Sequence, residues 1–559
     1  MLLLYAALFS AVALYLAAAV AFRRRGNAGL PPGPTGLPLV GSLLSLDPEL
    51  HTYFAGLAAR YGPIFSIRLG SKLGVVVSSP ALAREMLRGH NDLVFSSRDI
   101  PDAARAITYG GKQDILGVVV SSPALAREML RGHNDLVFSS RDIPDAARAI
   151  TYGGKQDIVW SPVGPTWRLL RRICVREMLS PAGLDNVAAL RRREFMATMR
   201  HLHAVSASGG GEAPVDVGAQ MFLTTMNVVA GTLWGGNIAG GGGEGEREAV
   251  GKEFRDLVAD MTEMLGAPNV SDFFPALAPF DLQGIRKKSD MLKHRFDEIF
   301  ARIIQQRTTK GGGGDETAAD FLEYMLKLEK EGGDGKAAFT MTNDLVVGGT
   351  ETTSNTVEWA MAELLKDRRA LRKVKEELDA VVGRDAVVEE HHLPRLHYLQ
   401  LVLKETLRLH PALPLMVPHC PTEDAIVAGH RVPAGSRVFV NVWAIQRDPA
   451  VWENPGEFIP ERFENAGSGD GGGRRLDFTG SEHDYMPFGS GRRICAGIAM
   501  AERMAGYSLA LLMQAFDWDL PAGERLDMEE RFAIVMKKAR PLVAVPTPRL
   551  SKPDLYYSS

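Results

Sequence analysis

A ten-residue loop near the C-terminus limits most strongly what this chain can fold around. It reads Phe-Gly-Ser-Gly-Arg-Arg-Ile-Cys-Ala-Gly over residues 488–497, with one cysteine in a glycine-rich turn. A lone thiolate cannot hold zinc, which takes about four ligands, but it suffices as the axial ligand of an iron that a porphyrin already holds. Gly491 and Gly497 let the backbone approach a flat macrocycle, and Arg493 can neutralise a propionate or stabilise the thiolate. The loop therefore favours a haem ligated by Cys495 over the alternative of a buried cysteine in a tight turn.

The same loop resembles the cysteine loop of the cytochrome P450 haem-thiolate monooxygenases, Phe-x-x-Gly-x-Arg-x-Cys-x-Gly. The chain matches this pattern at Phe488, Gly491, Arg493, Cys495 and Gly497. The resemblance implies that haem b is the cofactor, that these five residues help to bind it, and that Cys495 is the proximal ligand of the iron.

Length and composition fit one large enzyme body. The chain has 559 residues, of which 45% are apolar, and a formal net charge of −3. It can therefore bury a large core, and it shows no basic footprint for nucleic acid. Three cysteines, Cys174, Cys420 and Cys495, have no paired spacing. This argues against a disulfide framework and a cysteine-based zinc site, and it favours a reducing, cytosol-facing compartment.

The N-terminus predicts a membrane anchor. Residues 1–22 carry no charged side chain, and at about 1.5 Å per residue they are just long enough to cross a hydrocarbon core of about 30 Å. The basic cluster Arg23–Arg25 follows this apolar run, an order that keeps the C-terminal body cytosolic. A cleaved signal peptide is the alternative, because Ala17–Ala19 are small. The prolines of Leu30–Gly36 predict a stiff spacer, similar to the hinge of microsomal members of the family.

These segments predict three parts of the chain. Residues 1–22 form a transmembrane anchor, residues 23–41 a basic and proline-rich hinge, and residues 42–559 a haem-binding monooxygenase domain. By resemblance, we expect a single-pass protein of the endoplasmic reticulum membrane with its catalytic domain in the cytosol.

A 43-residue segment occurs twice without a single change, as residues 73–115 and 116–158. Each copy has an apolar strand-like run, an amphipathic helix (Pro80–Gly89, then Pro123–Gly132) and a polar loop. Solenoids need about three units, and their repeats diverge. We therefore expect either a recent tandem duplication or a gene-model error, of which the error is favoured. Without one copy the chain would have 516 residues, a usual length for microsomal members of the family.

We expect the core to hold only one of the two copies. The surplus segment should then loop out as a poorly packed insertion beside the substrate entrance.

Two glycines and three threonines interrupt a long helical pattern that runs from about Met341 to Leu365. The segment Gly-Gly-Thr-Glu-Thr-Thr over residues 348–353 costs a helix about 2–3 kcal/mol relative to alanine. It predicts a local gap or bend, or else a packing contact at small residues. It resembles the oxygen-binding helix of the family. The resemblance implies space for dioxygen at Gly348 and Gly349, and it implies that Glu351 and Thr352 are catalytic and deliver protons. Glu stands where many members have Asp.

A second constellation resembles the structural Glu-Arg-Arg triad of the family. Glu405 and Arg408 stand three residues apart and share a helical face. Arg462, in Pro-Glu-Arg-Phe over residues 460–463, would supply the second arginine.

A third constellation concerns the haem propionates. Trp167 and Arg171 stand four residues apart and resemble the Trp-x-x-x-Arg helix that binds propionates in the family. A solvated basic face is the alternative. His419, after Pro418, is a further propionate contact that the resemblance implies.

The chain carries no dinucleotide fingerprint after a predicted strand. Its glycine tracts at residues 240–243 and 311–314 lack the ending of a phosphate loop, so we interpret them as linkers. The chain is therefore not expected to bind NADPH or flavin, and its electrons must come from a partner. The resemblance implies that this partner is NADPH–cytochrome P450 reductase, docked on the basic face near Trp167.

Helical patterns dominate from Thr166 to Leu409, with short strands near residues 64–70, 437–441 and 542–545. We predict a mainly α fold with a small β region, which the resemblance specifies as the cytochrome P450 fold after one transmembrane helix. Haem would lie between the helix at 348–353 and the Cys495 loop. The largely apolar segments expected to line the substrate pocket are the loop before Trp167 and residues 266–282, 343–347, 413–417 and 532–535.

The resemblance implies an oxidoreductase acting on paired donors, a monooxygenase that inserts one atom of O2 into a small lipophilic substrate. The motifs resemble those of plant A-type members that are flavonoid 3'-hydroxylase-like or geraniol 8-hydroxylase-like. Flavonoids, terpenoids and aldoxime precursors all stay open as substrates. One alternative is a haem-thiolate isomerase or dehydratase that needs no O2, against which Glu351 and Thr352 argue. Another is a non-productive duplicated chain that lacks haem.

Overall fold

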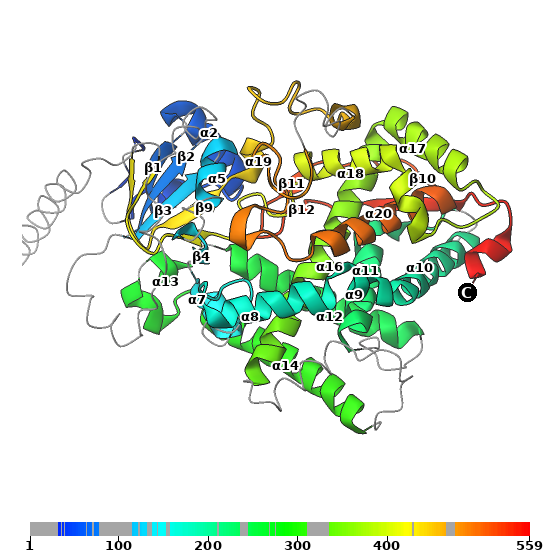
Figure 1. Cartoon of the computed structure of the whole chain (residues 1–559), viewed down its shortest axis with the longest axis horizontal. Coiled ribbons are helices and arrows are strands. Elements are labelled where there is room, and N and C mark those ends of the chain that lie inside the picture. Colours follow the sequence, from blue (N-terminus) through cyan, green and yellow to red (C-terminus); the bar gives the residue numbers. More distant parts are fainter. Residues whose placement is uncertain are drawn as a thin grey trace, which may run out of the picture.

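A small β region lies at one end of the molecule and a larger helical body fills the rest (Figure 1). The computed structural model describes residues 32–34, 36–37, 40–62, 64–69, 72–77, 115–120, 123–130, 137–141, 143–151, 157–208, 212–234, 244–267, 269–273, 275–309, 335–427, 430–464 and 476–558. Within these ranges no helix has both the length and the apolar character that crossing a membrane requires. The predicted anchor over residues 1–22 lies outside the described residues and stays a prediction.

The helices follow the chain in this order: α2 (Leu50–Tyr61), α5 (Pro123–Leu130), α7 (Asp145–Ile150), α8 (Pro165–Ile173), α9 (Pro181–Asn186), α10 (Ala188–Ser208), α11 (Val217–Trp234), α12 (Glu244–Gly266), α13 (Val270–Phe273), α14 (Ile285–Thr309), α16 (Gly335–Lys366), α17 (Arg368–Val381), α18 (His397–Leu409), α19 (Val442–Ile445) and α20 (Ile498–Ala515). Short 3-10 turns cover Pro460–Phe463 and Gly491–Arg493.

The strands are β1 (Ile64–Leu69), β2 (Lys72–Val77), β3 (Ile115–Val120), β4 (Ser140–Arg141), β5 (Val215–Asp216), β6 (His419–Cys420), β7 (Ala425–Val427), β8 (His430–Val432), β9 (Arg437–Val440), β10 (Phe516–Asp519), β11 (Glu530–Arg531), β12 (Lys537–Lys538) and β13 (Val543–Pro548). The strands expected near 64–70, 437–441 and 542–545 are therefore present as β1, β9 and β13. The prediction of a mainly α fold with a small β region is confirmed.

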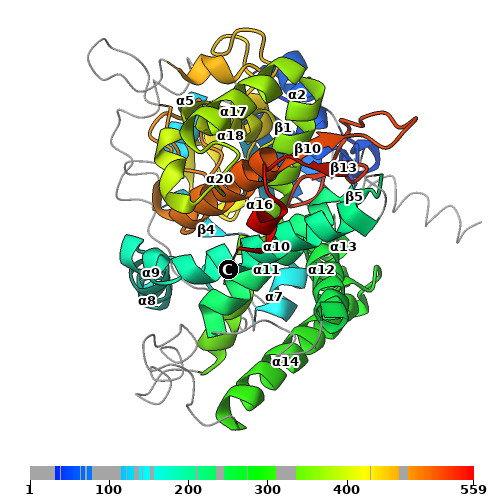
Figure 2. The ribbon, with the colours of Figure 1, turned by 90° about the vertical axis from the view of Figure 1, so that its right-hand side faces the viewer.

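Helix α16 runs through the middle of the helical body, with α17, α18 and α20 on one side and α10, α11 and α12 on the other (Figure 2). Its residues Val357, Trp359 and Met361 are almost fully buried. The expected helix over 341–365 is confirmed, and it is continuous through the Gly-Gly-Thr-Glu-Thr-Thr segment. The hydroxyl groups of Thr350 and Thr352 donate hydrogen bonds to main-chain carbonyls one turn earlier, at 2.8 and 2.7 Å. These bonds satisfy the hydroxyl groups inside the helix.

The largest sheet has the strand order β1-β2-β3-β9-β6-β4. Strand β1 pairs with β2 in antiparallel fashion, whereas β2–β3 and β3–β9 are parallel pairs. Phe65, Ile67 and Leu69 of β1 are buried against Phe54 of α2 and Leu415. This apolar cluster fixes the β region to α2 and to the chain after α18.

The two identical segments contribute adjacent strands to this sheet. Strand β2 comes from the first copy and β3 from the second, and they pair in register, so that Leu73 lies beside Leu116 and Val75 beside Val118. The expectation that the surplus copy loops out is therefore wrong for its strand, because an apolar strand next to a sheet gains a full set of main-chain hydrogen bonds. Residues 78–114, including the expected helix over 80–89, lie outside the described residues.

The second copy supplies the expected helix as α5. Ala126, Met129 and Leu130 of this helix are buried. Arg127 donates hydrogen bonds to Glu482 and His483, both at 3.0 Å, close to the cysteine loop. The second copy is thus the one that packs against the C-terminal half of the chain.

We predict that a variant lacking residues 73–115 folds and binds haem at least as well as the full chain. Strand β3 lies beside β2 in register and has the same residues at every position except the first, where Ile115 lies beside Lys72, so a single copy can pair with β1 on one edge and with β9 on the other. The measurement is thermal unfolding together with haem content. Loss of folded protein in this variant would show that the added strand is required.

Candidate active site

A cavity of about 1020 Å³ separates α16 from the cysteine loop. Gly348 and Thr352 form part of its wall on the α16 side, and Phe488, Cys495 and Gly497 form part of the opposite side. The structure thus brings together two segments that lie almost 150 residues apart in the sequence. A flat ligand placed between them would contact both.

The cysteine loop is folded so that its thiol faces this cavity. Gly489 and Gly491 have positive φ angles of 79° and 71°, which a residue with a side chain rarely adopts. The N–H of Cys495 donates to the carbonyl of Phe488 at 3.0 Å, and the N–H of Gly497 lies 3.3 Å from the sulfur of Cys495. Helix α20 begins directly afterwards, at Ile498.

Two effects act on the protonation of this thiol. Burial within the protein raises the pKa of Cys495, while the Gly497 N–H and the charge of Arg171 act in the opposite direction. Cys495 is exposed by surface area, and it lines the cavity. The sulfur is therefore open to a ligand in the cavity and is aided in carrying negative charge by a hydrogen bond and a nearby cation.

Positively charged side chains surround the same cavity. Arg171 of α8 donates from Nη2 to the carbonyl of Ile494 at 2.5 Å, and Arg493 donates to the carbonyls of Ser139 and Ile158 at 2.5 and 3.1 Å. These bonds hold the guanidinium groups in place through neutral carbonyl oxygens. Both arginines line the cavity and can offer their charge to an anion there.

The ring of Trp167 packs against the guanidinium group of Arg493. Its indole N–H donates to the carbonyl of Ile158 at 3.2 Å, and its ring centroid lies 4.7 Å from the guanidinium carbon of Arg493. The ring is buried, with 6% of its surface exposed. The predicted propionate residues Trp167, Arg171 and Arg493 are therefore adjacent, with the tryptophan acting as a platform for the arginine.

Arg141 belongs to this group, although sequence reasoning missed it. It lies in the duplicated segment, in β4, and donates to the carbonyl of Val417. Its Nε has no hydrogen-bond partner among the described residues. Burial and the nearby charge of Arg493 lower its pKa well below the usual value. A partly buried cation beside another cation favours a bound anion, a role that the two carboxylates of a haem could fill.

His419 of β6 also lines the cavity and is almost fully buried. Its Nδ1 faces the carbonyl of Phe138, which can only accept, so Nδ1 carries a proton. Burial and the charge of Arg141 lower the pKa of His419 well below its usual value. In the neutral form Nε2 can only accept. His419 can therefore donate to a propionate only if the bound carboxylate favours the charged imidazole.

The two glycines of α16 differ in their surroundings. A Cβ at Gly348 would meet no atom within 4 Å, whereas one at Gly349 would lie 3.1 Å from Val229 of α11. Gly348 therefore leaves open space at the cavity, as expected. Gly349 also lines the cavity, but its small size is needed where α16 packs against α11.

Thr352 and Glu351 point to different surroundings. Thr352 lines the cavity, but Glu351 is absent from the part of its wall that the described residues form. Glu351 is 4% exposed, and its carboxylate forms an ion pair with Lys537 of β12. The sequence placed these two residues side by side but gave no sign of the lysine partner.

Only some of the segments that were expected to line the substrate pocket form part of the cavity wall. Asp344, Leu345, Leu413, Met416 and Val417 line the cavity, whereas the described residues of 266–282 and 532–535 are not part of its wall. The wall also contains an acid within the segment that was expected to be largely apolar. Burial and the neighbouring Asp157 raise the pKa of Asp344 well above its usual value.

Glu405, Arg408 and Arg462 form one buried ion-pair network. Arg408 donates to both oxygens of Glu405, at 2.7 and 2.8 Å, and Arg462 donates to one of them at 3.0 Å. Arg408 also donates to the carbonyls of Pro455 and Glu457. Both Glu405 and Arg408 have no exposed surface. The network thus ties α18 to the chain that leads to the cysteine loop.

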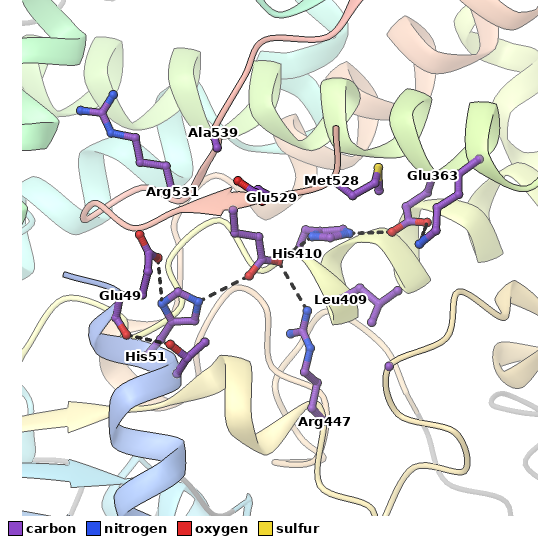
Figure 3. A pocket seen from close by; sticks show the side chains of 14 residues that line it. Glu49, His51, Glu363, Leu409, His410, Arg447, Met528, Glu529, Arg531 and Ala539 are labelled. Atoms are coloured by element: carbon purple, nitrogen blue, oxygen red, sulfur yellow. Dashed lines mark hydrogen bonds and ion pairs between the residues drawn. The ribbon is translucent and has the colours of Figure 1, made fainter. Parts of the chain in front are cut away.

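A second polar cluster lies at the far end of α16, around a cavity of about 690 Å³ (Figure 3). His410 lies between two carboxylates, with Nδ1 2.8 Å from Glu530 and Nε2 2.8 Å from Glu363. Its ring stacks on Trp359 at 3.8 Å. The indole N–H of Trp443 donates to the other oxygen of Glu530 at 3.0 Å. Glu530 belongs to β11, so this cluster holds the β11–β12 hairpin against α16 and α18.

The thiol of a glycine-rich loop faces a helix across a cavity whose wall contains several arginines. This is the arrangement expected of a haem-thiolate protein. The family model for cytochrome P450 matches residues 31–117 and 109–545. A flavonoid 3'-monooxygenase from Crocosmia x crocosmiiflora is 34% identical over 93% of both chains. Geraniol 8-hydroxylase from Swertia mussotii is 36% identical over 95% of this chain and 96% of its own. The chain belongs to the cytochrome P450 family; it is a monooxygenase, and its cofactor is haem b.

Solved structures support the fold. A zebrafish cytochrome P450 bound to progesterone superposes with a TM-score of 0.66 at 23% identity, covering 90% of this chain and all of the other. The two segments that match the family model overlap at residues 109–117, around the junction of the two copies. This is the pattern expected of a chain that carries one part of the family twice.

We predict that Glu405→Ala yields protein without haem. Removing the acid leaves Arg408 buried without its carboxylate, which costs about 3–5 kcal/mol. The measurement is haem content per protein together with thermal unfolding. The matched control is Glu464→Ala, which changes an exposed glutamate a few residues from Arg462. Normal haem content in Glu405→Ala would contradict the structural role of the network.

Proposed function

We propose that this protein inserts one atom of O2 into a small lipophilic substrate, using electrons from NADPH that a cytochrome P450 reductase delivers. The observation that carries the proposal is that Cys495 faces Gly348 and Thr352 across one cavity. A thiolate on one side and an open, hydroxyl-bearing helix turn on the other are what oxygen chemistry at an iron needs.

Haem would be held by residues from three parts of the chain: β4, α8 and the cysteine loop. The sulfur of Cys495 would ligate the iron, with Phe488 beside it. Arg141, Arg171 and Arg493 would pair with the propionates. When bound, the haem supplies the redox chemistry of oxygen activation.

The protein's own contribution is proton handling and the exclusion of water. Thr352 offers a hydroxyl group to the cavity, and its hydrogen bond to the carbonyl of Gly348 fixes the direction of that group. Glu351, one position earlier, would be the acid that returns a proton to the hydroxyl group of Thr352. The apolar side chains Leu345, Leu413 and Val417 would keep bulk water from the reacting centre.

The substrate class follows from the cavity and from the relatives. Most of the wall is apolar, and apart from the arginines and His419 its polar groups include Thr352 and Asp344. Relatives are named for flavonoids and for geraniol. A flavonoid or a monoterpene alcohol is therefore the substrate class that we propose.

The cellular location of the protein is proposed from its sequence alone. Residues 1–22 would anchor the chain in the endoplasmic reticulum membrane, with residues 23–41 as the hinge and the monooxygenase domain in the cytosol. This arrangement places the domain beside a membrane-bound reductase and beside lipophilic substrates.

The test is reconstitution of the full chain with reductase, NADPH and O2, after a screen for compounds that shift the ferric haem spectrum. We predict a hydroxylated product from a flavonoid or from geraniol, and no product when NADPH, reductase or O2 is left out. Turnover without these components would indicate the isomerase or dehydratase alternative. Purified protein without haem would indicate the non-productive chain.

A further inference from the structure

The acid next to Thr352 has a partner that the sequence did not reveal. Lys537 of β12 brings its Nζ into direct contact with Oε1 of Glu351. The side chain of Glu351 is 6% exposed and that of Lys537 is 26% exposed. One end of the pair thus lies in the interior, while the other still reaches solvent.

The two oxygens of this carboxylate have different environments. Oε1 is held by the ammonium group, whereas Oε2 is buried and has no hydrogen-bond partner among the described residues. A buried carboxylate oxygen without a partner is costly and calls for an explanation. Bound water or a proton would satisfy this atom.

The residue before Lys537 is held through its main chain by one hydrogen bond from a side chain of α16 and one to the chain after α18. Asn355, one helical turn after Glu351, donates to the carbonyl of Met536 at 3.3 Å. The N–H of Met536 donates to the carbonyl of Ala412 at 2.8 Å. Both bonds act on the residue directly before Lys537, so the lysine cannot move freely away from α16.

The hairpin is also held at its other strand. Glu530 of β11 is bound by His410 in the cluster of Figure 3 and also accepts a hydrogen bond from the indole N–H of Trp443. Lys538, next to Lys537, lies 4.4 Å from the ring centroid of Trp359 on α16. The position of Lys537 is therefore set by the whole β11–β12 hairpin and not by its own side chain alone.

We propose that Lys537 is the positioning residue of Glu351: it holds Oε1 on the side of α16 away from the cavity and leaves Oε2 as the oxygen that carries the proton. Oε2 takes a proton from a hydronium ion of the solvent, which becomes water, and returns to the carboxylate form when it passes that proton to the hydroxyl oxygen of Thr352, which gives up its own hydroxyl proton to the cavity. Glu351 is unchanged over a full cycle. This proposal rests on the proposed function, in which Glu351 takes part in proton delivery.

The test compares Lys537→Met and Lys537→Arg in the full, haem-loaded chain. Lys537→Met keeps the aliphatic stem but removes the charge. We expect it to lower product formed per NADPH consumed by about tenfold, since a misplaced acid loses much of its effect, and to change the solvent isotope effect on product formation. Lys537→Arg restores a cation and should stay within about twofold of the unchanged protein.

The matched control is Arg531→Met, which removes a cation from the same hairpin. Arg531 pairs with Lys537 across the two strands but forms its ion pair with Glu263, at 3.1 Å. Product per NADPH should be unchanged in this variant.

Thermal unfolding supplies a readout that does not depend on turnover. The losses in melting temperature from Lys537→Met and Glu351→Gln should be non-additive in the double variant, whereas Arg531→Met and Glu351→Gln should add.

Two results would overturn the proposal. If Lys537→Met matches the unchanged protein in product per NADPH and isotope effect while Glu351→Gln does not, the acid works without the lysine. If Glu351→Gln also matches, the acid has no part in proton delivery and the lysine has nothing to position. In both cases the unchanged protein still forms product from NADPH and O2, so the proposed function stands.

Discussion

Three partly buried arginines and one thiol face the same cavity, and the rest of the site depends on this arrangement. Burial lowers the pKa of Arg141 and of Arg171, and the nearby charge of Arg493 lowers the pKa of Arg141 further. Carbonyl oxygens hold the guanidinium groups of Arg171 and Arg493 in place. A bound haem would resolve this, since its carboxylates would pair with the arginines and Cys495 would supply the sulfur ligand of its iron.

The fold supplies a rigid frame for this cavity. Helix α16 forms one wall, and the network of Glu405, Arg408 and Arg462 fixes the chain that leads to the opposite wall. The β11–β12 hairpin lies on the far side of α16 and is clamped through Glu530 and Lys537. The acid and the alcohol of α16 are thereby separated, with Thr352 at the cavity and Glu351 at the hairpin. One helix can then serve the reacting centre on one face and exchange protons on another.

Sequence reasoning succeeded where the signal is local. The Cys495 loop, the helix with Gly348 and Thr352, and the pair Glu405–Arg408 are encoded in short spacings, and the structure places them as these spacings suggest. It failed where partners come from distant segments. Arg141 and Lys537 stand in no motif of their own, and only the fold brings them to the propionate region and to Glu351. The placement of β2 was missed for a related reason, because pairing between two identical strands depends on the sheet and not on either strand alone.

The central claim is tested most directly by Cys495→Ser, with Cys420→Ser as the control. The account predicts that Cys495→Ser loses the absorbance band of the reduced, CO-bound haem that marks a thiolate ligand and loses NADPH-dependent product formation, while Cys420→Ser keeps both. If Cys495→Ser keeps the thiolate-type band and full turnover, the sulfur of Cys495 is not the iron ligand and the account is contradicted.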